Sequence, residues 1–220
     1  MREMLRKLLY PSGKYHPAYT KYLTWSFISN VVVSVESAMA SHSMLAAIGY
    51  QSETYRTINY VGKDIIGQLG ALGYISKMST KADKEPYKFL TYSHIVQQAG
   101  FISMFVTPLV PTFFLPIAGC SNVLSNISFA GFGAVNAMCI QKLATDNNVG
   151  EVYAKISLIN MIGSSLGLLA GVGITVAIPD HTIRLCLTPC LAVARVYSLK
   201  QAVNTLILVL HQHIFKLSFV

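Results

Sequence analysis

Long apolar runs, separated by short polar segments, occupy most of this chain. Tyr22–Ile48 is apolar apart from Glu36 and His42, and Ile156–Pro179 carries no charged residue. A helix as long as the first run reaches about 40 Å, which exceeds the roughly 30 Å of the hydrocarbon core of a bilayer. Each of these two runs therefore predicts a helix that spans a membrane.

Two further regions show the same pattern with interruptions. Tyr55–Ser76 is apolar except at its centre, where charged residues occur. Phe89–Gln141 carries no formal charge, and it is long enough for two spans of about 20 residues each. Pro108, Pro111 and Pro116 lie near its middle, and they predict a hinge at Thr107–Thr112, because proline breaks helices.

The remaining segments predict connections and an uncertain end. Basic loops are expected at Lys77–Lys88 and Lys142–Lys155, and a polar turn at Asp180–Arg184. Leu185–Val220 is ambiguous, because its apolar stretches are short and Pro189 interrupts the first of them. Together the pattern predicts an all-α fold, a polytopic transmembrane helical bundle of five or six spans.

Composition supports the membrane interpretation. Only 12% of the residues are charged and 53% are hydrophobic, whereas soluble domains carry about 25% charged residues. A chain this apolar is also not intrinsically disordered. What remains is a membrane protein or a subunit that is almost wholly buried in a complex. We favour the first, so the lipid bilayer is the expected partner, and the protein is expected to be a multi-pass integral membrane protein whose organelle the sequence does not name.

The net charge of +8 is distributed unevenly among the predicted loops. With six spans, fourteen basic residues fall on the side of the N-terminus, whereas Arg56 and Arg184 fall on the opposite side. The positive-inside rule then places the N-terminus on the cytosolic or an equivalent side. Since no nucleic-acid motif accompanies the basic residues, nucleic acid is not an expected partner. The basic segment 1–21 has the features of neither a secretory signal nor a transit peptide.

Lys63 and Asp64 form a candidate intramembrane polar site. Charged groups inside hydrocarbon cost about 2.5–3.5 kcal/mol on insertion scales, so they usually have a partner or a function. One interpretation is structural: Lys63 pairs with a neighbouring helix, for which Glu36 is the candidate, or extends to the interface. The other is contact with a solute or ion.

Two glycine series predict close helix packing. The glycines of the first recur every three residues and those of the second every four, so each series lies on one helix face. A face without side chains lets another helix approach, and this drives association inside membranes. The residues are Gly67, Gly70 and Gly73 in the second run, and Gly163, Gly167 and Gly171 in the last uncharged run. A solute route along the groove is the alternative interpretation.

No catalytic or metal-binding pattern is found. Cys186, Cys190, His211 and His213 could be combined into a zinc set, but no polar loop presents them. Serine, histidine and aspartate occur without triad spacing, and nucleotide-binding motifs are absent from the sequence. We therefore expect a protein that is not an enzyme, with no metal and no cofactor.

Several segments in order resemble the family of plant root UV-B sensitive proteins, also described as a domain of unknown function. The resemblance covers about residues 17–204. It rests on Pro17–Trp25, Ala46–Gly49, Lys63–Gly70, Pro108–Pro111, Asp146–Asn148, Glu151–Ser157, Leu168–Gly171, Val196–Leu199 and Val203–Asn204. The chain differs at Ile65, where the family has a glycine after Lys-Asp.

This resemblance implies three parts: a basic N-terminal segment (1–21), a family transmembrane domain (22–204) and a short divergent C-terminal tail (205–220). It implies an integral membrane protein linked to vitamin B6 or auxin homeostasis and to the UV-B response. Catalytic residues are not implied. The leading hypothesis is a transporter-like protein for a small solute, which acts alone, as a homo-oligomer or with another family member. The alternative is a membrane scaffold without transport activity, which recruits a partner through Lys77–Lys88.

Overall fold

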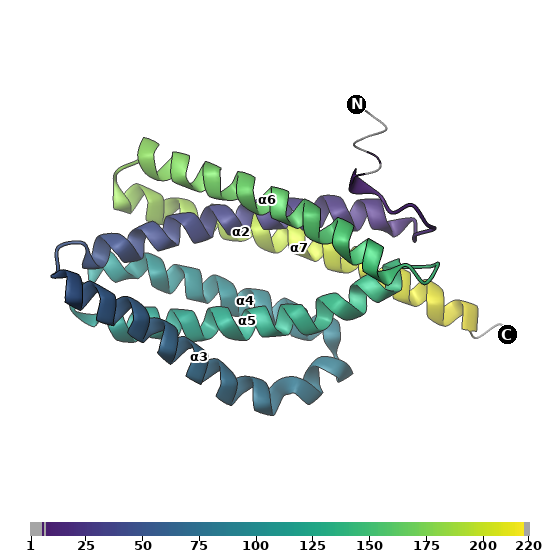
Figure 1. Cartoon of the computed structure of the whole chain (residues 1–220), viewed down its shortest axis with the longest axis horizontal. Helices are drawn as coiled ribbons and strands as arrows, with labels where there is room; N and C mark the ends of the chain where they lie inside the picture. The colour runs from purple at the N-terminus through teal and green to yellow at the C-terminus, as the bar shows by residue number, and fades with distance from the viewer. Residues whose placement is uncertain (1–5, 7, 218–220) are drawn as a thin grey trace. The chain divides into compact units, whose positions relative to one another are not determined.

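The regular structure of the described residues is almost entirely helical. The computed structural model describes residue 6 and residues 8–217. Its helices are α2 (Ala18–Ile48), α3 (Glu53–Lys84), α4 (Pro86–Val106), η1 (Thr107–Leu109), η2 (Pro111–Phe113), α5 (Phe114–Leu143), α6 (Val149–Ala177) and α7 (His181–Leu217) (Figure 1). Outside the helices, the β-type pairing in the described residues is an isolated bridge between Tyr15 and Ala144. The predicted all-α class is confirmed.

Within the described residues, four segments are long and apolar enough to cross a membrane. They are Ala18–Ile48, Pro111–Gly133, Val149–Ala177 and His181–Leu206. The helices α3 and α4 do not meet this criterion, because charged residues interrupt α3 and polar residues such as Gln97 and Gln98 interrupt α4. Of the five or six predicted spans, the described residues therefore show four candidate spans.

The predicted hinge between the two uncharged spans is confirmed. The backbone changes from α-helix to two short 3-10 turns at Thr107–Leu109 and Pro111–Phe113, and α5 begins directly afterwards. Each turn carries one proline, at its first or second position, where the missing N–H of proline costs no hydrogen bond. The two prolines thus end one helix and start the next.

Pro189 behaves differently, because α7 continues through it. Proline provides no N–H for the carbonyl four residues earlier, which here is Leu185. The Thr188 hydroxyl donates a hydrogen bond of 2.7 Å to that carbonyl. Of the segment that was ambiguous in the sequence, residues 185–217 therefore belong to a single helix, and residues 218–220 lie outside the described part of the chain.

Three predicted connections are wrong in their bounds. The segment expected as a basic loop at Lys77–Lys88 is helical up to Lys84, and α4 starts at Pro86. The connection expected at Lys142–Lys155 is limited to residues 144–148, because α6 begins at Val149. The turn expected at Asp180–Arg184 is shorter still, since Asp180 precedes the first residue of α7. Helix thus extends into polar segments that hydropathy alone assigns to loops.

The chain divides into two compact units, which are described separately. Unit 1 contains Met1–Ser34, Asn136–Gly167 and Val193–Val220, and unit 2 contains Val35–Val135 and Leu168–Ala192.

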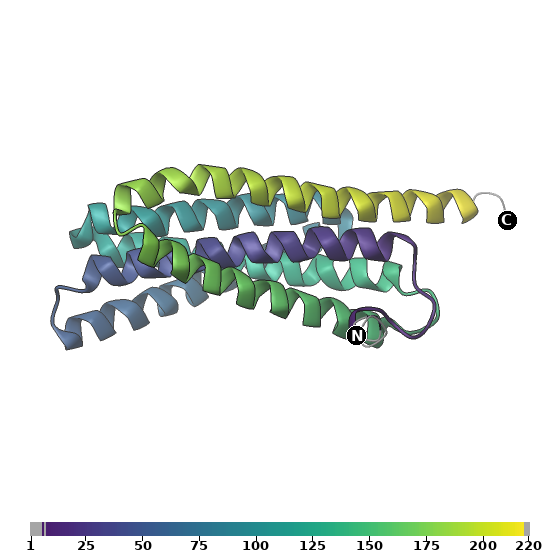
Figure 2. The same ribbon diagram turned by 90° about the horizontal axis from the view of Figure 1, so that it is seen from above.

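In unit 1 the first part of α6 packs closely on the first part of α2. A Cβ added at Gly163 would lie 3.0 Å from the Phe27 ring, and one at Gly167 would collide with the backbone of Val31. The residues before α2 run beside the connection between α5 and α6 (Figure 2). The His16 N–H donates a 3.0 Å hydrogen bond to the carbonyl of Leu143, the last residue of α5.

In unit 2, α5 packs against both α3 and α4. Gly119 of α5 faces the Ile66 side chain of α3, and Gly100 of α4 faces the backbone of Ser121 on α5. Deeper along α4, the Ser128 hydroxyl donates a hydrogen bond to the Ser93 carbonyl. Small residues therefore bring these three helices close together, which prepares the contacts of the polar side chains described next.

Candidate functional site

Lys63 and Asp64 form an ion pair in the first half of α3. The Lys63 Nζ and Asp64 Oδ1 atoms are 2.7 Å apart, and the side chains are 7% and 46% exposed, respectively. Adjacent helix positions point about 100° apart, so the long lysine side chain must bend toward the carboxylate. The same ammonium lies 3.9 Å from the centre of the Tyr60 ring, an arrangement that stabilises a cation.

Asn122 of α5 joins this pair across the helix interface. Its Nδ2 atom donates hydrogen bonds to Asp64 Oδ1 at 2.6 Å and to the Lys63 carbonyl at 3.2 Å. Gly67 makes the approach possible, because a Cβ at this position would lie 2.7 Å from the Asn122 Cβ. The sequence analysis missed both Tyr60 and Asn122. The Asn122 side chain is an amide within an uncharged apolar run, which is the signal that could have identified it, although Ser121, Ser125 and Asn126 lie close to it in the sequence.

Glu36 lies elsewhere in unit 2, with a different partner. Its side chain is fully buried, and its Oε1 atom accepts a 2.6 Å hydrogen bond from Gln98 Nε2 of α4. The ion pair considered between Lys63 and Glu36 is therefore not the arrangement found. The structure brings Lys63 together with Asp64, and it brings Glu36 together with Gln98.

A second basic group is buried at the start of α7. Arg184 is 3% exposed, and its Nη1 atom lies 2.8 Å from His42 Nδ1 of α2. Nearby in sequence, the His181 Nε2 atom lies 2.9 Å from the Phe105 carbonyl. The sequence analysis had placed Arg184 in a polar turn between two spans. Because α7 begins at His181, Arg184 instead lies inside the helix and faces α2.

The glycines differ in what they contact. Gly67 and Gly70 face Asn122 and Val123 of α5. Gly163 and Gly167 face α2 within unit 1, and Gly171 faces Val35 and Ala38 of α2 within unit 2. Around Gly73, no described atom lies within 4 Å of an added Cβ, so the close packing expected there is not found.

The helix α4 buries several polar side chains beside apolar ones such as Phe101 and Phe105, and it exposes other apolar side chains. The buried positions of α4 include Ser93, His94, Gln97 and Gln98, whereas Tyr92, Ile95 and Ile102 are exposed. Soluble proteins rarely expose large contiguous apolar areas.

The helix α3 has a similar distribution, although Gln68 and Ser76 are also exposed. Asn59 and Lys63 are buried, but the opposite face is apolar and exposed, up to 65% at Leu69. The exposed apolar residues of this face are Ile58, Val61, Ile65, Leu69, Leu72 and Ile75. On these two helices, apolar side chains therefore face outward while several polar side chains are buried.

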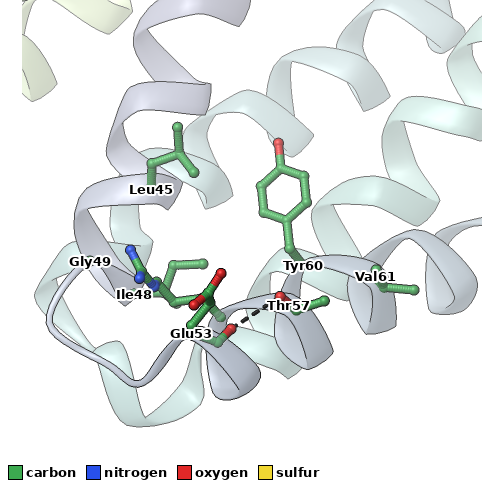
Figure 3. Close-up of a pocket in the computed structure, with 8 residues that line it drawn as sticks. Leu45, Ile48, Gly49, Glu53, Thr57, Tyr60 and Val61 are labelled. Carbon is green, nitrogen blue, oxygen red and sulfur yellow. Dashed lines mark hydrogen bonds between the residues drawn. The ribbon is translucent and has the colours of Figure 1, made fainter.

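A hollow of about 530 Å³ lies between the end of α2 and the start of α3 (Figure 3). In the close-up, Leu45 of α2 and Tyr60 of α3 lie on opposite sides of it. Arg56 and Glu53 supply charged groups of both signs to its lining. Since the Tyr60 ring also contacts Lys63, one side chain connects this hollow with the ion pair. The volume is within the range of small-molecule sites, about 300–1,000 Å³.

Comparisons with known proteins show what the chain resembles. A family described as the vitamin B6 photo-protection and homoeostasis domain matches residues 2–211. Among curated proteins of Arabidopsis thaliana, the chain is 27% identical to Protein root UVB sensitive 4 over 158 residues, which cover 70% of this chain and 30% of the relative. It is 26% identical to Protein root UVB sensitive 5, covering 77% of this chain and 36% of the relative.

A third relative, the chloroplastic Protein root UVB sensitive 2 of the same plant, is 23% identical and matches 90% of this chain and 47% of its own length. The chain thus spans less than half of the length of each of these relatives. No solved structure matches it.

Proposed function

Because the chain belongs to the root UVB sensitive family, whose shared region is the vitamin B6 photo-protection and homoeostasis domain, we propose that it moves a small polar solute across a membrane. In this proposal α3 and α4 join the four candidate spans, so that the bundle has six. The Lys63–Asp64 pair, together with Asn122 and Tyr60, contacts the solute. The protein carries out no covalent reaction.

The observation that carries the proposal is that α3 and α4 bury polar side chains and expose apolar ones. Contact of the exposed apolar face of α3 with water is unfavourable, whereas contact with hydrocarbon is favourable. From Ile58 to Ile75 this face extends about 26 Å at 1.5 Å per residue, close to the roughly 30 Å of a bilayer core. Charged residues in membrane helices almost always face the bundle interior, as Lys63 does here. These features support α3 as a fifth span and α4 as a sixth.

The ion pair suits a solute that carries hydrogen-bonding groups of both kinds. Lys63 supplies a donor, and Asp64, which remains 46% exposed, supplies an acceptor. The Tyr60 ring offers a flat apolar surface at the edge of the hollow of Figure 3. Unphosphorylated vitamin B6 forms combine an aromatic ring with polar substituents, and the description of the family names this vitamin. They are therefore the first solutes to test, followed by auxin.

Transport by the purified full chain in liposomes tests the proposal. We expect saturable uptake of labelled pyridoxine, pyridoxal or pyridoxamine. The substitutions Lys63→Met and Asp64→Asn keep side-chain volume and remove one charge each, and each should reduce uptake about tenfold or more. Lys142→Gln, at the exposed end of α5, is the control and should leave uptake unchanged.

The alternative function, a membrane scaffold, predicts a different result. If the protein is a scaffold, liposomes that contain it take up no more of any of these solutes than empty liposomes do. In cells it loses its phenotype when Lys77, Lys81, Lys84 and Lys88 are changed to glutamine, but not when Lys63 or Asp64 is changed. That combination of results would replace transport by partner recruitment. The bilayer is the proposed partner in both cases, and a homo-oligomer or another family member is compatible with either.

A further inference from the structure

A second hollow, of about 640 Å³, lies in unit 1 and shares no residue with the site described above. We call it the N-terminal pocket. It is lined by Arg6, Tyr10, Pro11, Ser12, Gly13, Tyr15, Glu151 and Lys155. The first six of these residues precede α2, and the last two lie in the first two turns of α6. The pocket is therefore formed where the basic N-terminal segment meets the start of a candidate span.

The N-terminal segment is fixed in place by several hydrogen bonds. The Ser12 N–H donates to Glu151 Oε1 at 2.8 Å, and the Ser12 hydroxyl donates to the same oxygen. Asn148 Nδ2 donates to the Lys14 carbonyl at 3.0 Å, beside the bridge between Tyr15 and Ala144. The pocket thus has a preformed wall, which reduces the entropy lost when a ligand binds.

Three tyrosines add rigidity and an aromatic surface. The ring centres of Tyr10 and Tyr15 are 6.0 Å apart, and each ring also contacts Tyr19. Tyr19 is fully buried, and its hydroxyl donates a 3.0 Å hydrogen bond to the Leu9 carbonyl. Tyr10 and Tyr15 line the pocket, so they provide apolar ring surface and phenolic hydroxyl groups to a ligand.

The charges of the lining favour an anion. Arg6 and Lys155 are its two cations, and Glu151 is its one carboxylate. Ser12 donates two hydrogen bonds to one oxygen of this carboxylate, so the wall itself satisfies part of its acceptor capacity. Lys155 follows Glu151 by four residues and lies on the same helix face. An arginine can bind phosphate with two parallel hydrogen bonds, and a lysine adds a point charge.

We propose that the N-terminal pocket binds a phosphate monoester, with Arg6 and Lys155 holding the phosphate and Tyr10 and Tyr15 contacting the group that carries it. A phosphorylated vitamin B6 form and the headgroup of phosphatidic acid both present this chemistry. The pocket is a regulatory or recruiting site in addition to the transport site. A negative result in the tests below would leave the transport proposal unaffected, because those tests measure ligand binding and do not measure uptake.

Titration of the purified full chain in detergent with pyridoxamine 5′-phosphate tests the soluble source. This probe has no aldehyde, so it does not form an imine with lysine, and pyridoxamine is its phosphate-free match. We expect saturable binding of the phosphate form that is at least about tenfold tighter than binding of pyridoxamine. Arg6→Gln and Lys155→Gln should each weaken it about tenfold, and Lys155→Arg should restore most of it.

Lys14→Gln is the matched control, because Lys14 is an exposed cation of the same segment that does not line the pocket. It should bind the probe as the unchanged protein does. Circular dichroism and a thermal unfolding curve establish that each variant is folded before titration. Equal binding of pyridoxamine and its phosphate, or equal weakening by Lys14→Gln and Arg6→Gln, overturns the proposal.

Nanodiscs test the lipid source. If the soluble probe does not bind, the ³¹P signal of phosphatidic acid in nanodiscs that contain the protein should shift. Arg6→Gln and Lys155→Gln should abolish the shift, and phosphatidylcholine should show none. This result supports the site and assigns it to lipid. Absence of both responses, or a phosphatidic acid shift that both variants retain, overturns the proposal.

Discussion

Asn122 on α5 donates a 2.6 Å hydrogen bond to the carboxylate of Asp64 on α3. The two residues are 58 positions apart, and the same amide also reaches the Lys63 carbonyl. One side chain therefore holds the Asp64 carboxylate, the backbone at Lys63 and the α3–α5 interface in register. The first two predictions follow from this contact.

Replacing Asn122 by leucine should destabilise the protein by about 1 kcal/mol, the scale of an interhelical hydrogen bond in a membrane protein. The leucine keeps a similar volume but leaves Asp64 without this donor. Thermal or denaturant unfolding in one detergent measures the effect. Asn126→Leu, one turn later on α5, is the control, and an equal loss of stability in both variants would contradict a specific role of the hydrogen bond.

Two glycines of α3 should respond to alanine in opposite ways. Gly67→Ala places a Cβ 2.7 Å from the Asn122 Cβ, so the helices must separate at a cost of about 1–3 kcal/mol. At Gly73 the added Cβ meets no described atom within 4 Å, and alanine should stabilise the helix by up to about 1 kcal/mol. Unfolding midpoints of the two variants check this. A matching shift in the same direction for both would count against the observed packing.

Thr188 should be needed for α7 to continue as a helix across Pro189. Thr188→Val keeps the shape of the side chain but removes the hydroxyl that reaches the Leu185 carbonyl at 2.7 Å. We expect a loss of about 1 kcal/mol and faster amide hydrogen exchange in the turn that follows Pro189. Thr188→Ser retains the hydroxyl and should behave like the unchanged protein. Slow exchange in the valine variant would argue against this role.

The exposed apolar face of α3 should be covered by lipid. In a background without native cysteines, Leu69→Cys in nanodiscs should react with a membrane-impermeant maleimide at least about tenfold more slowly than Tyr50→Cys, because hydrocarbon excludes the charged reagent. Tyr50 is fully exposed in the turn before α3. Comparable labelling rates at the two positions would remove α3 from the set of spans.

The start of α7 should depend on pH through Asp180. The backbone N–H groups of Ile183 and Thr182 donate hydrogen bonds to this carboxylate, and they hold its pKa below its ordinary value of 3.8. Because its pKa is lowered, the ionised Asp180 side chain stabilises the folded helix at pH values above its ordinary pKa. This stabilisation is lost as the pH falls through the lowered pKa.

Amide exchange at Thr182 and Ile183 measures the effect of this cap. The exchange rate, corrected for the intrinsic rates, should increase as the pH falls through the lowered pKa of Asp180. Asp180→Asn retains a capping oxygen but does not titrate, so its corrected exchange should stay constant. A variant with the same pH dependence as the unchanged protein would exclude Asp180 as the cause.

Particular residues show how far the sequence could be interpreted. Pro108 and Pro111 predicted the hinge correctly, because a missing N–H acts within one helical turn. The helical extension past Ser76 was missed, since hydropathy reports where apolar side chains end and not where backbone hydrogen bonds end. The burial of Arg184 was missed because its partner His42 is 142 positions away.

The sequence by itself determined the family, the helical class and the apolar length of the candidate spans, because these depend on composition and on order along the chain. Only the tertiary structure decided that Lys63 pairs with Asp64, that Asn122 joins them and that Glu36 meets Gln98. Such partners depend on the register and separation of neighbouring helices. Those quantities are fixed where small residues such as Gly67 allow backbones to approach, and they are properties of two surfaces together.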